Sequence, residues 1–114
     1  MRIFIVVGLA LACTACATPG DVAGKAPFAT YASGKDPQAL AGCIAPKVTA
    51  EWPQTRVIPI DGGQRILASG SAFGDVIAAV DVKAAQKGSN AEIRQGAGRM
   101  GVLTGIVDSV KACQ

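Results

Sequence analysis

The sequence predicts an α+β fold for residues 36–114, a two-layer sandwich in which two helices cover one face of a four-stranded antiparallel sheet. Three observations favour this fold class. Apolar residues recur at helical spacing at both ends of this region, they alternate with other residues between these ends, and each helical stretch contains one cysteine. Because a region of this size has room for one core only, we expect a single small domain in the order helix, four-stranded meander, helix.

The first helix is expected within residues 35–52. Asp36 is a suitable N-cap, and Pro37 suits the first helical position. Pro46 lacks a backbone N–H and should kink or shorten this helix. The predicted core-facing side of the helix comprises Leu40, Cys43, Ile44 and Val48.

The second helix is expected over residues 101–114. Asp108 and Lys111 fall outside its apolar stripe. The stripe itself comprises Val102, Leu103, Ile106, Val107, Val110 and Cys113. The cysteine of each helix therefore points into the predicted core.

Four strands are expected between the helices. Asp61, Gly62 and Gly63 separate the first two strands and are typical of a hairpin turn. Pro59 cannot donate a backbone hydrogen bond, which places the first strand at an edge of the sheet. In the third strand, the alternation sets Asp81 on the side opposite Val80 and Val82. The expected strands are residues 55–60, 64–69, 75–83 and 91–95.

The beginning of the chain has the organisation of an export signal. Met1 and Arg2 give a positive start, and residues 3–12 form an uninterrupted apolar run. This run is too short to span a bilayer, which requires roughly 20 apolar residues. Cys13 and Cys16 follow it directly. We therefore expect a signal peptide, and we expect the two cysteines at its end to serve a function other than export.

Residues 1–20 resemble the signals of small bacterial lipoproteins, in which small or aliphatic residues precede a cysteine that becomes lipidated. Cys16 opens the segment "CATPG", which looks like the start of a mature lipoprotein, whereas Cys13 follows the acceptable triplet Ala-Leu-Ala. The resemblance implies a signal peptide over residues 1–15, lipidation with palmitate at Cys16 or alternatively at Cys13, and a place in the bacterial cell envelope. In the lipoproteins that this segment resembles, an aspartate after the lipidated cysteine favours the inner membrane; no aspartate follows Cys13 or Cys16, so the resemblance implies the outer membrane, with the domain facing the periplasm. Ordinary signal cleavage after Ala17 is the alternative.

Residues 16–35 are expected to form a flexible tether between the lipid and the domain. They mix Pro, Gly, Ala, Ser and Thr without a sustained helical or strand period. Phe28 and Tyr31 are the exceptions. We expect these aromatic side chains either to dock on the domain or to serve as exposed anchors of a binding segment.

Cys43 and Cys113 remain in the chain after any processing of the signal. Their spacing fits none of the paired motifs that hold zinc or carry out redox exchange. Because an exported domain folds in an oxidising compartment, we expect the two residues to form a disulfide. Closing a loop of about 70 residues contributes roughly 4 kcal/mol to stability.

The composition argues against catalysis, a bound metal or a cofactor. The chain contains no histidine, which excludes Ser-His-Asp and Cys-His sites and histidine metal ligands. Its eight acidic residues are scattered singly, and no pair has the spacing of a glycosidase dyad. Removal of Arg2 with the signal leaves ten of the eleven basic residues, without a basic cluster, so nucleic acid is not expected as a partner.

The segment GAGRMG, residues 96–101, matches the glycine pattern of dinucleotide-binding sites. Such a site requires a second parallel strand and an acidic residue about 20 positions further on. The sequence given extends only 13 residues beyond Gly101. We therefore expect a flexible connection into the last helix, with Gly98 and Arg99 as candidates for binding an anion at the helix N-terminus.

These observations predict a membrane-anchored envelope lipoprotein that acts as a binding or interaction module and not as an enzyme. Its expected partners are the membrane, through the lipid anchor, and an envelope or exogenous protein. The alternatives are a structural accessory of an envelope complex, a lysozyme-type inhibitor, and a phage-encoded lipoprotein that excludes superinfecting phage. The segment "ASGSAFG", which contains Ser69 and Ser71, resembles a loop of lysozyme inhibitors of the lipoprotein class over a few residues only.

Overall fold

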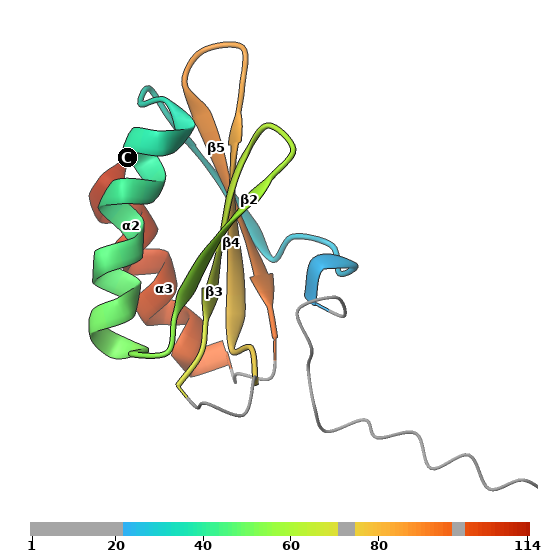
Figure 1. The fold of residues 1–114 in the computed structure, drawn as a ribbon, viewed down its shortest axis with the longest axis vertical. Coiled ribbons are helices and arrows are strands. Elements are labelled where there is room, and N and C mark those ends of the chain that lie inside the picture. Colours follow the sequence, from blue (N-terminus) through green and yellow to red (C-terminus); the bar gives the residue numbers. More distant parts are fainter. Residues whose placement is uncertain (1–21, 71–74, 97–99) are drawn as a thin grey trace, which may run out of the picture.

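The computed structural model describes residues 22–70, 75–96 and 100–114. Within these residues it contains a five-stranded antiparallel sheet and two helices that pack on one face of the sheet (Figure 1). The predicted α+β class is therefore confirmed. In chain order, the elements are β1 (Ala29–Ser33), α2 (Pro37–Glu51), β2 (Arg56–Ile60), β3 (Gly63–Ala68), β4 (Ala78–Ala84), β5 (Ser89–Gln95) and α3 (Met100–Cys113).

The strands lie in the order β1-β5-β4-β3-β2, and every neighbouring pair is antiparallel. Strands β2 to β5 form the predicted meander, and β2, which contains Pro59, lies at an edge as expected. The prediction of four strands is wrong, because β1 pairs with β5 and adds a fifth strand at the other edge. This strand lies inside residues 16–35, the expected tether. Its sequence, ATYAS, is typical of a linker, and backbone pairing with β5 makes it a strand.

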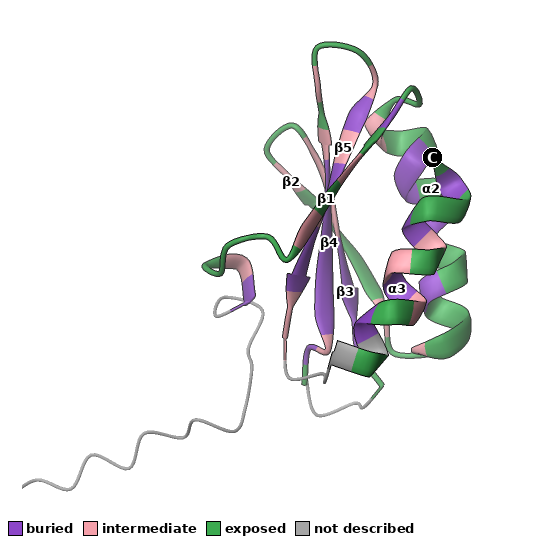
Figure 2. Cartoon of the chain, turned by 180° about the vertical axis from the view of Figure 1, so that it is seen from behind, coloured by how far each residue is buried: buried purple, intermediate pink, exposed green. Residues whose placement is uncertain are grey.

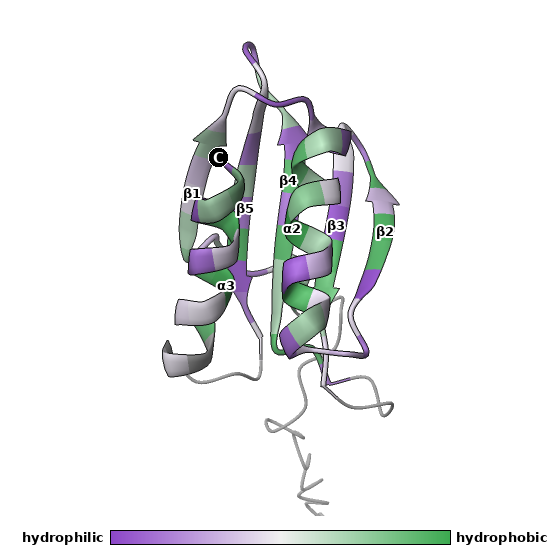
Figure 3. Ribbon diagram, turned by 90° about the vertical axis from the view of Figure 1, so that its left-hand side faces the viewer, coloured by the Kyte–Doolittle hydropathy of each residue, from purple (hydrophilic) through white to green (hydrophobic). Residues whose placement is uncertain are grey.

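Helix α2 begins as the sequence predicts. The Asp36 carboxylate accepts a 2.8 Å hydrogen bond from the backbone N–H of Ala39, and Pro37 occupies the first turn. The helix continues through Pro46 to Glu51, so the predicted shortening does not occur; Pro46 lies on its exposed side. As a result, α2 covers β3 and β4, while α3 lies over β1 and β5 (Figure 3).

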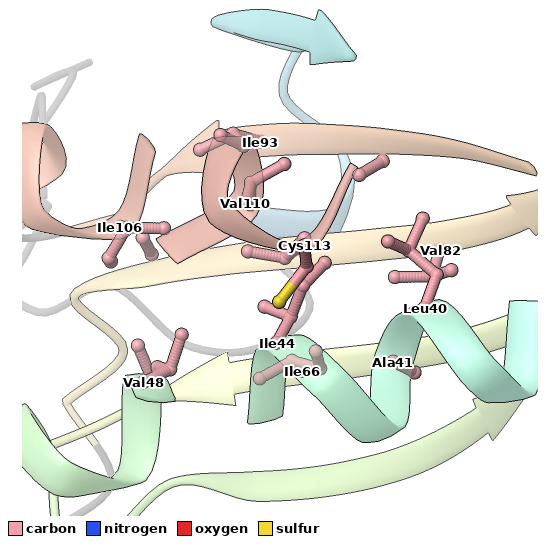
Figure 4. Packing of buried hydrophobic residues seen from close by; sticks show 14 of the residues in the cluster. Leu40, Ala41, Ile44, Val48, Ile66, Val82, Ile93, Ile106, Val110 and Cys113 are labelled. Carbon is pink, nitrogen blue, oxygen red and sulfur yellow. The ribbon is translucent and has the colours of Figure 1, made fainter. Parts of the chain in front are cut away.

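The main core lies between the helices and the sheet. Figure 2 shows buried residues on the inner sides of both helices and along the central strands. Side chains of α2 and α3 meet across this layer (Figure 4). The sulfur atoms of Cys43 and Cys113 are 2.10 Å apart, which confirms the predicted disulfide between the two helices. The largest core side chains include Leu40, Ile44, Ile66, Val80, Val82, Ile93, Leu103 and Ile106.

The other face of the sheet, which we call the bare face, is covered by neither α2 nor α3. Residues 22–28, which we call the strap, lie beside this face, opposite the helices, and are blue in Figure 1. The side chain of Val22 is fully buried there, in a second apolar cluster with Leu67, Val76 and Ala79. The strap is therefore part of the folded domain, although the sequence predicts a tether at this point.

Candidate functional site

The structure brings together only part of the predicted site residues. Cys43 and Cys113 form the disulfide that links the helices. Ser69 is buried. Outside the residues that the structure describes lie Cys13, Cys16, Ser71, Gly98 and Arg99. Lipidation and anion binding therefore stay predictions.

A groove of about 290 Å³ runs between β1 and α3, and we call it the edge groove. One wall consists of Phe28, directly before β1, and Tyr31. The other wall is helix α3, which contributes Leu103, Thr104, Val107, Asp108 and Lys111. Aromatic and aliphatic side chains therefore share the lining about equally with polar groups, among them one side chain of each charge.

Tyr31 connects the edge groove to the main core. It pairs with Ala91 of β5 on the face that the helices cover, and its side chain packs against the core. The Nζ atom of Lys111 lies 5.7 Å from the centre of the Tyr31 ring, within reach of a cation–π attraction. Phe28, in contrast, is 44% exposed. Of the two aromatic residues, Tyr31 thus docks on the domain and Phe28 faces solvent at the groove.

The outer edge of β1 borders the same groove. Among the described residues, β1 has a neighbouring strand on one side only. The side-chain amide of Gln114 donates a 2.8 Å hydrogen bond to the carbonyl oxygen of Ala32, while Thr30 stays exposed. The opposite edge, β2, contains Pro59, which has no N–H to offer a further strand. An open strand edge and a groove with a mixed apolar and polar lining therefore occur together at β1.

A second groove, of about 430 Å³, lies between α2 and α3. A Cβ atom at Gly105 would lie 2.7 Å from Oε2 of Glu51, the end of an exposed side chain that can move aside. The lining residues are Lys47, Ala50, Glu51, Gly105, Asp108, Ser109 and Ala112. Since this set lacks a large apolar side chain, the groove offers little area for a hydrophobic contact.

A network of charged side chains crosses the bare face. The carboxylate of Asp81 is fully buried and accepts two hydrogen bonds from Arg65, of 2.6 and 2.9 Å, and one of 2.8 Å from Arg94. Arg94 also donates a 2.9 Å hydrogen bond to Glu92, which accepts one of 3.3 Å from Lys83. Each of these five side chains therefore has at least one partner of opposite charge.

The hydrogen bond to Asp81 raises the pKa of Arg65, against a smaller lowering by burial. The pKa of Arg65 is higher in the folded state than in the unfolded state. The hydrogen bond to Asp81 therefore stabilises the fold throughout the neutral pH range, and this stabilisation is lost only at strongly alkaline pH. The sequence sets Asp81 on the side opposite Val80 and Val82, as the register confirms, but it does not predict which side the helices cover or that this carboxylate is buried. The signal in the sequence is the position of this acidic residue between Val80 and Val82.

Comparison with known proteins identifies no relative, because the chain matches no family model, no curated protein and no solved structure. In residues 22–70, 75–96 and 100–114, neither helix is long and apolar enough to cross a membrane. The same residues contain no group of three or more His, Cys, Asp or Glu side chains arranged to hold a metal ion. The edge groove is the candidate functional site because it combines the exposed Phe28 with a strand edge that has no neighbour among the described residues.

Proposed function

We propose that this protein is a lipid-anchored lipoprotein of the bacterial envelope that binds a protein partner in the edge groove. The observation that carries the proposal is the exposed Phe28 in a groove of mixed apolar and polar lining at an open strand edge. Exposed aromatic side chains are enriched at protein interfaces, where they bury a large area at a small cost in side-chain entropy. The partner supplies an apolar segment that covers Phe28 and fills the groove.

The chemistry of the groove favours binding over catalysis. Its polar side chains are Thr104, Asp108 and Lys111, besides the hydroxyl of Tyr31. Lys111 lies against the Tyr31 ring, and no histidine exists in the chain to act as a general base near neutral pH. These groups suit the polar rim of an interface, with Leu103 and Val107 below it.

Site-specific photo-crosslinking in the cells that produce the protein tests this proposal. A benzophenone side chain at Thr104, which is exposed and lines the groove, is expected to capture one protein in stoichiometric amount. The matched control is the same group at Thr49, an exposed residue of α2 outside the groove. Capture of a soluble or phage protein indicates recognition of an outside target, while capture of an envelope assembly indicates an accessory role.

A pair of alanine variants then tests the role of the groove itself. Phe28→Ala is expected to lower the yield at Thr104 by about tenfold or more, as for a residue at the centre of an interface. Val57→Ala removes a side chain of similar exposure, 46% against 44%, at the opposite edge of the sheet, and should leave the yield unchanged. Equal yields for both variants, or equal capture at Thr49, would show that the edge groove is not the binding site.

A further inference from the structure

The bare face carries more positive than negative charge. Cross-strand pairing places on it the cations Arg56, Arg65, Lys83 and Arg94 and the anions Asp81 and Glu92. The strap adds Lys25, whose carbonyl oxygen accepts a hydrogen bond from Arg94. Lys25 and Arg56 are exposed, and neither forms an ion pair within the described part of the chain. These two cations are therefore available to an external anion.

The helix layer has no such excess of charge. Helix α2 contains Lys47 and Glu51, and α3 contains Asp108 and Lys111, so positive and negative side chains balance on that side. A negatively charged surface would therefore attract the domain by its bare face. The helix side would be attracted less strongly to the same surface, because its charges balance.

The strap also brings the proposed lipid anchor to the bare face. Val22 is fully buried on this face, and it follows Cys16 by only six residues. Because an extended chain spans at most about 3.6 Å per residue, an acyl group on Cys16 lies within roughly 20 Å of Val22. Lipidation at Cys13 would lengthen this distance to about 30 Å. In either case the anchor leaves the domain from the positively charged side.

We infer that the bare face rests on the anionic phospholipid surface of the membrane in which the protein is anchored. The inference depends on the proposed lipid anchor, which holds the domain at a high local concentration above that surface. Lys25, Arg56 and the half-exposed Lys83 contact the headgroups. Each basic residue near an anionic membrane increases the bound population by about fivefold, and salt screens this gain.

The inferred orientation gives the edge groove a defined position. With the bare face toward the membrane, α2 and α3 form the side of the domain directed away from it (Figure 1). The edge groove lies between α3 and β1, and so opens at the side of the domain. The membrane contact therefore restricts the tethered domain to orientations in which a partner in the adjoining compartment reaches Phe28.

Lysine acetylation on vesicles, read by mass spectrometry, measures this orientation. The mature lipoprotein is reconstituted in phosphatidylethanolamine with phosphatidylglycerol, and separately in phosphatidylcholine alone. We expect Lys25 and Lys83 to react about fivefold more slowly on the anionic vesicles, and high salt to remove the difference. Lys47 and Lys111, on the helix side, serve as internal controls and should react equally on both.

Charge reversal supplies the matched variants. Arg56→Glu combined with Lys25→Glu changes only exposed side chains and should abolish the protection of Lys83. Lys47→Glu, on α2, should leave that protection intact. Equal reactivity of Lys83 on both lipids, or protection of Lys47 and Lys111 in its place, overturns the inference.

Failure of the inference is distinguishable from failure of the proposed function. If the intact mass confirms the acyl chains and Lys83 is nevertheless unprotected, the orientation is wrong while the anchor stands. If no acyl chain is found, the proposed anchor is wrong, and the inference falls with it. Partner capture at Thr104 is measured independently of both results.

Discussion

The Nε atom of Arg94 donates a 3.0 Å hydrogen bond to the backbone carbonyl oxygen of Lys25 and so joins the strap to the bare face of the sheet. The same guanidinium group contacts Asp81 and Glu92 at 2.8 and 2.9 Å. A single side chain on β5 thus links the segment nearest the proposed lipid anchor to the centre of the sheet. The residues from Val22 onward therefore belong to the domain and not to the expected tether.

Val22→Asp is expected to release the strap. Val22 is fully buried, so the variant would bury a charge unless the strap detaches, and the lost burial is worth about 1.5–3 kcal/mol. Trypsin should then cleave after Lys25 about tenfold faster or more, since every 1.4 kcal/mol changes a population tenfold. Ala50→Asp, at an exposed position of α2 remote from the Lys25–Ala26 bond, is the control. Equal cleavage of both variants would show that the strap is not held by Val22.

Asp81→Asn is expected to destabilise the domain by about 3 kcal/mol. The variant removes a buried negative charge and leaves Arg65 and Arg94, which are 19% and 10% exposed, without full compensation. Urea unfolding measures the loss. Asp61→Asn, in the exposed hairpin turn, should change stability by less than about 0.5 kcal/mol. A loss at Asp81 no larger than this control would mean that the network contributes nothing to the fold.

Gly88→Ala is expected to disturb the pairing of β1. Gly88 has a φ of +76°, and a Cβ atom there would lie 2.1 Å from the carbonyl oxygen of Ser33, at the end of β1. The backbone strain and the shift that the clash requires cost together about 2 kcal/mol. Amide hydrogen exchange should therefore accelerate in Ala29–Ser33.

Gly34→Ala is the control for this variant, because a Cβ atom at Gly34 meets nothing within 4 Å and its φ is not positive. Its hydrogen exchange should match that of the wild type. Since β1 forms one wall of the edge groove, Gly88→Ala should also lower partner capture at Thr104. Unchanged exchange in β1 would show that the close approach of residue 88 to Ser33 is not required.

Loss of the disulfide is expected to lower the free energy of unfolding by about 4 kcal/mol. Cys43 and Cys113 are separated by 70 residues in sequence, and the chain-entropy argument gives this value for a loop of that length. In a domain of this size the midpoint of thermal unfolding should fall by at least about 15 °C. The double variant Cys43→Ala with Cys113→Ala shows the loss directly, and reductant should then have no further effect. A decrease below about 1 kcal/mol would contradict this account.

The sequence predicts the fold where side-chain pattern determines the element. The helical stripes that contain Cys43 and Cys113 predict both helices and the bond between them, and Pro59 predicts the edge position of β2. Strand β1 is different, because four of its five residues are alanine, serine or threonine. Such a strand is stabilised by backbone pairing with β5. The pattern of apolar side chains in the sequence does not reveal this pairing.

The candidate site is less accessible to prediction. Phe28 and Tyr31 are recognisable in the sequence as the only aromatic residues of a polar stretch, but their separate roles depend on β1 and α3 lying side by side. Burial of Val22 and Asp81 likewise depends on contacts across the sheet, between residues distant in sequence. The bare face and its charge therefore follow only from the register of the strands.

The intact mass of the mature protein from native membranes tests the proposed lipid anchor most directly, measured before and after reduction. The account predicts a chain that begins at Cys16, with the added mass of its acyl groups and an increase of about two daltons when the disulfide is reduced. A chain that begins at Cys13 with the same modifications would leave the account intact. An unmodified chain that begins at Thr18 would contradict it.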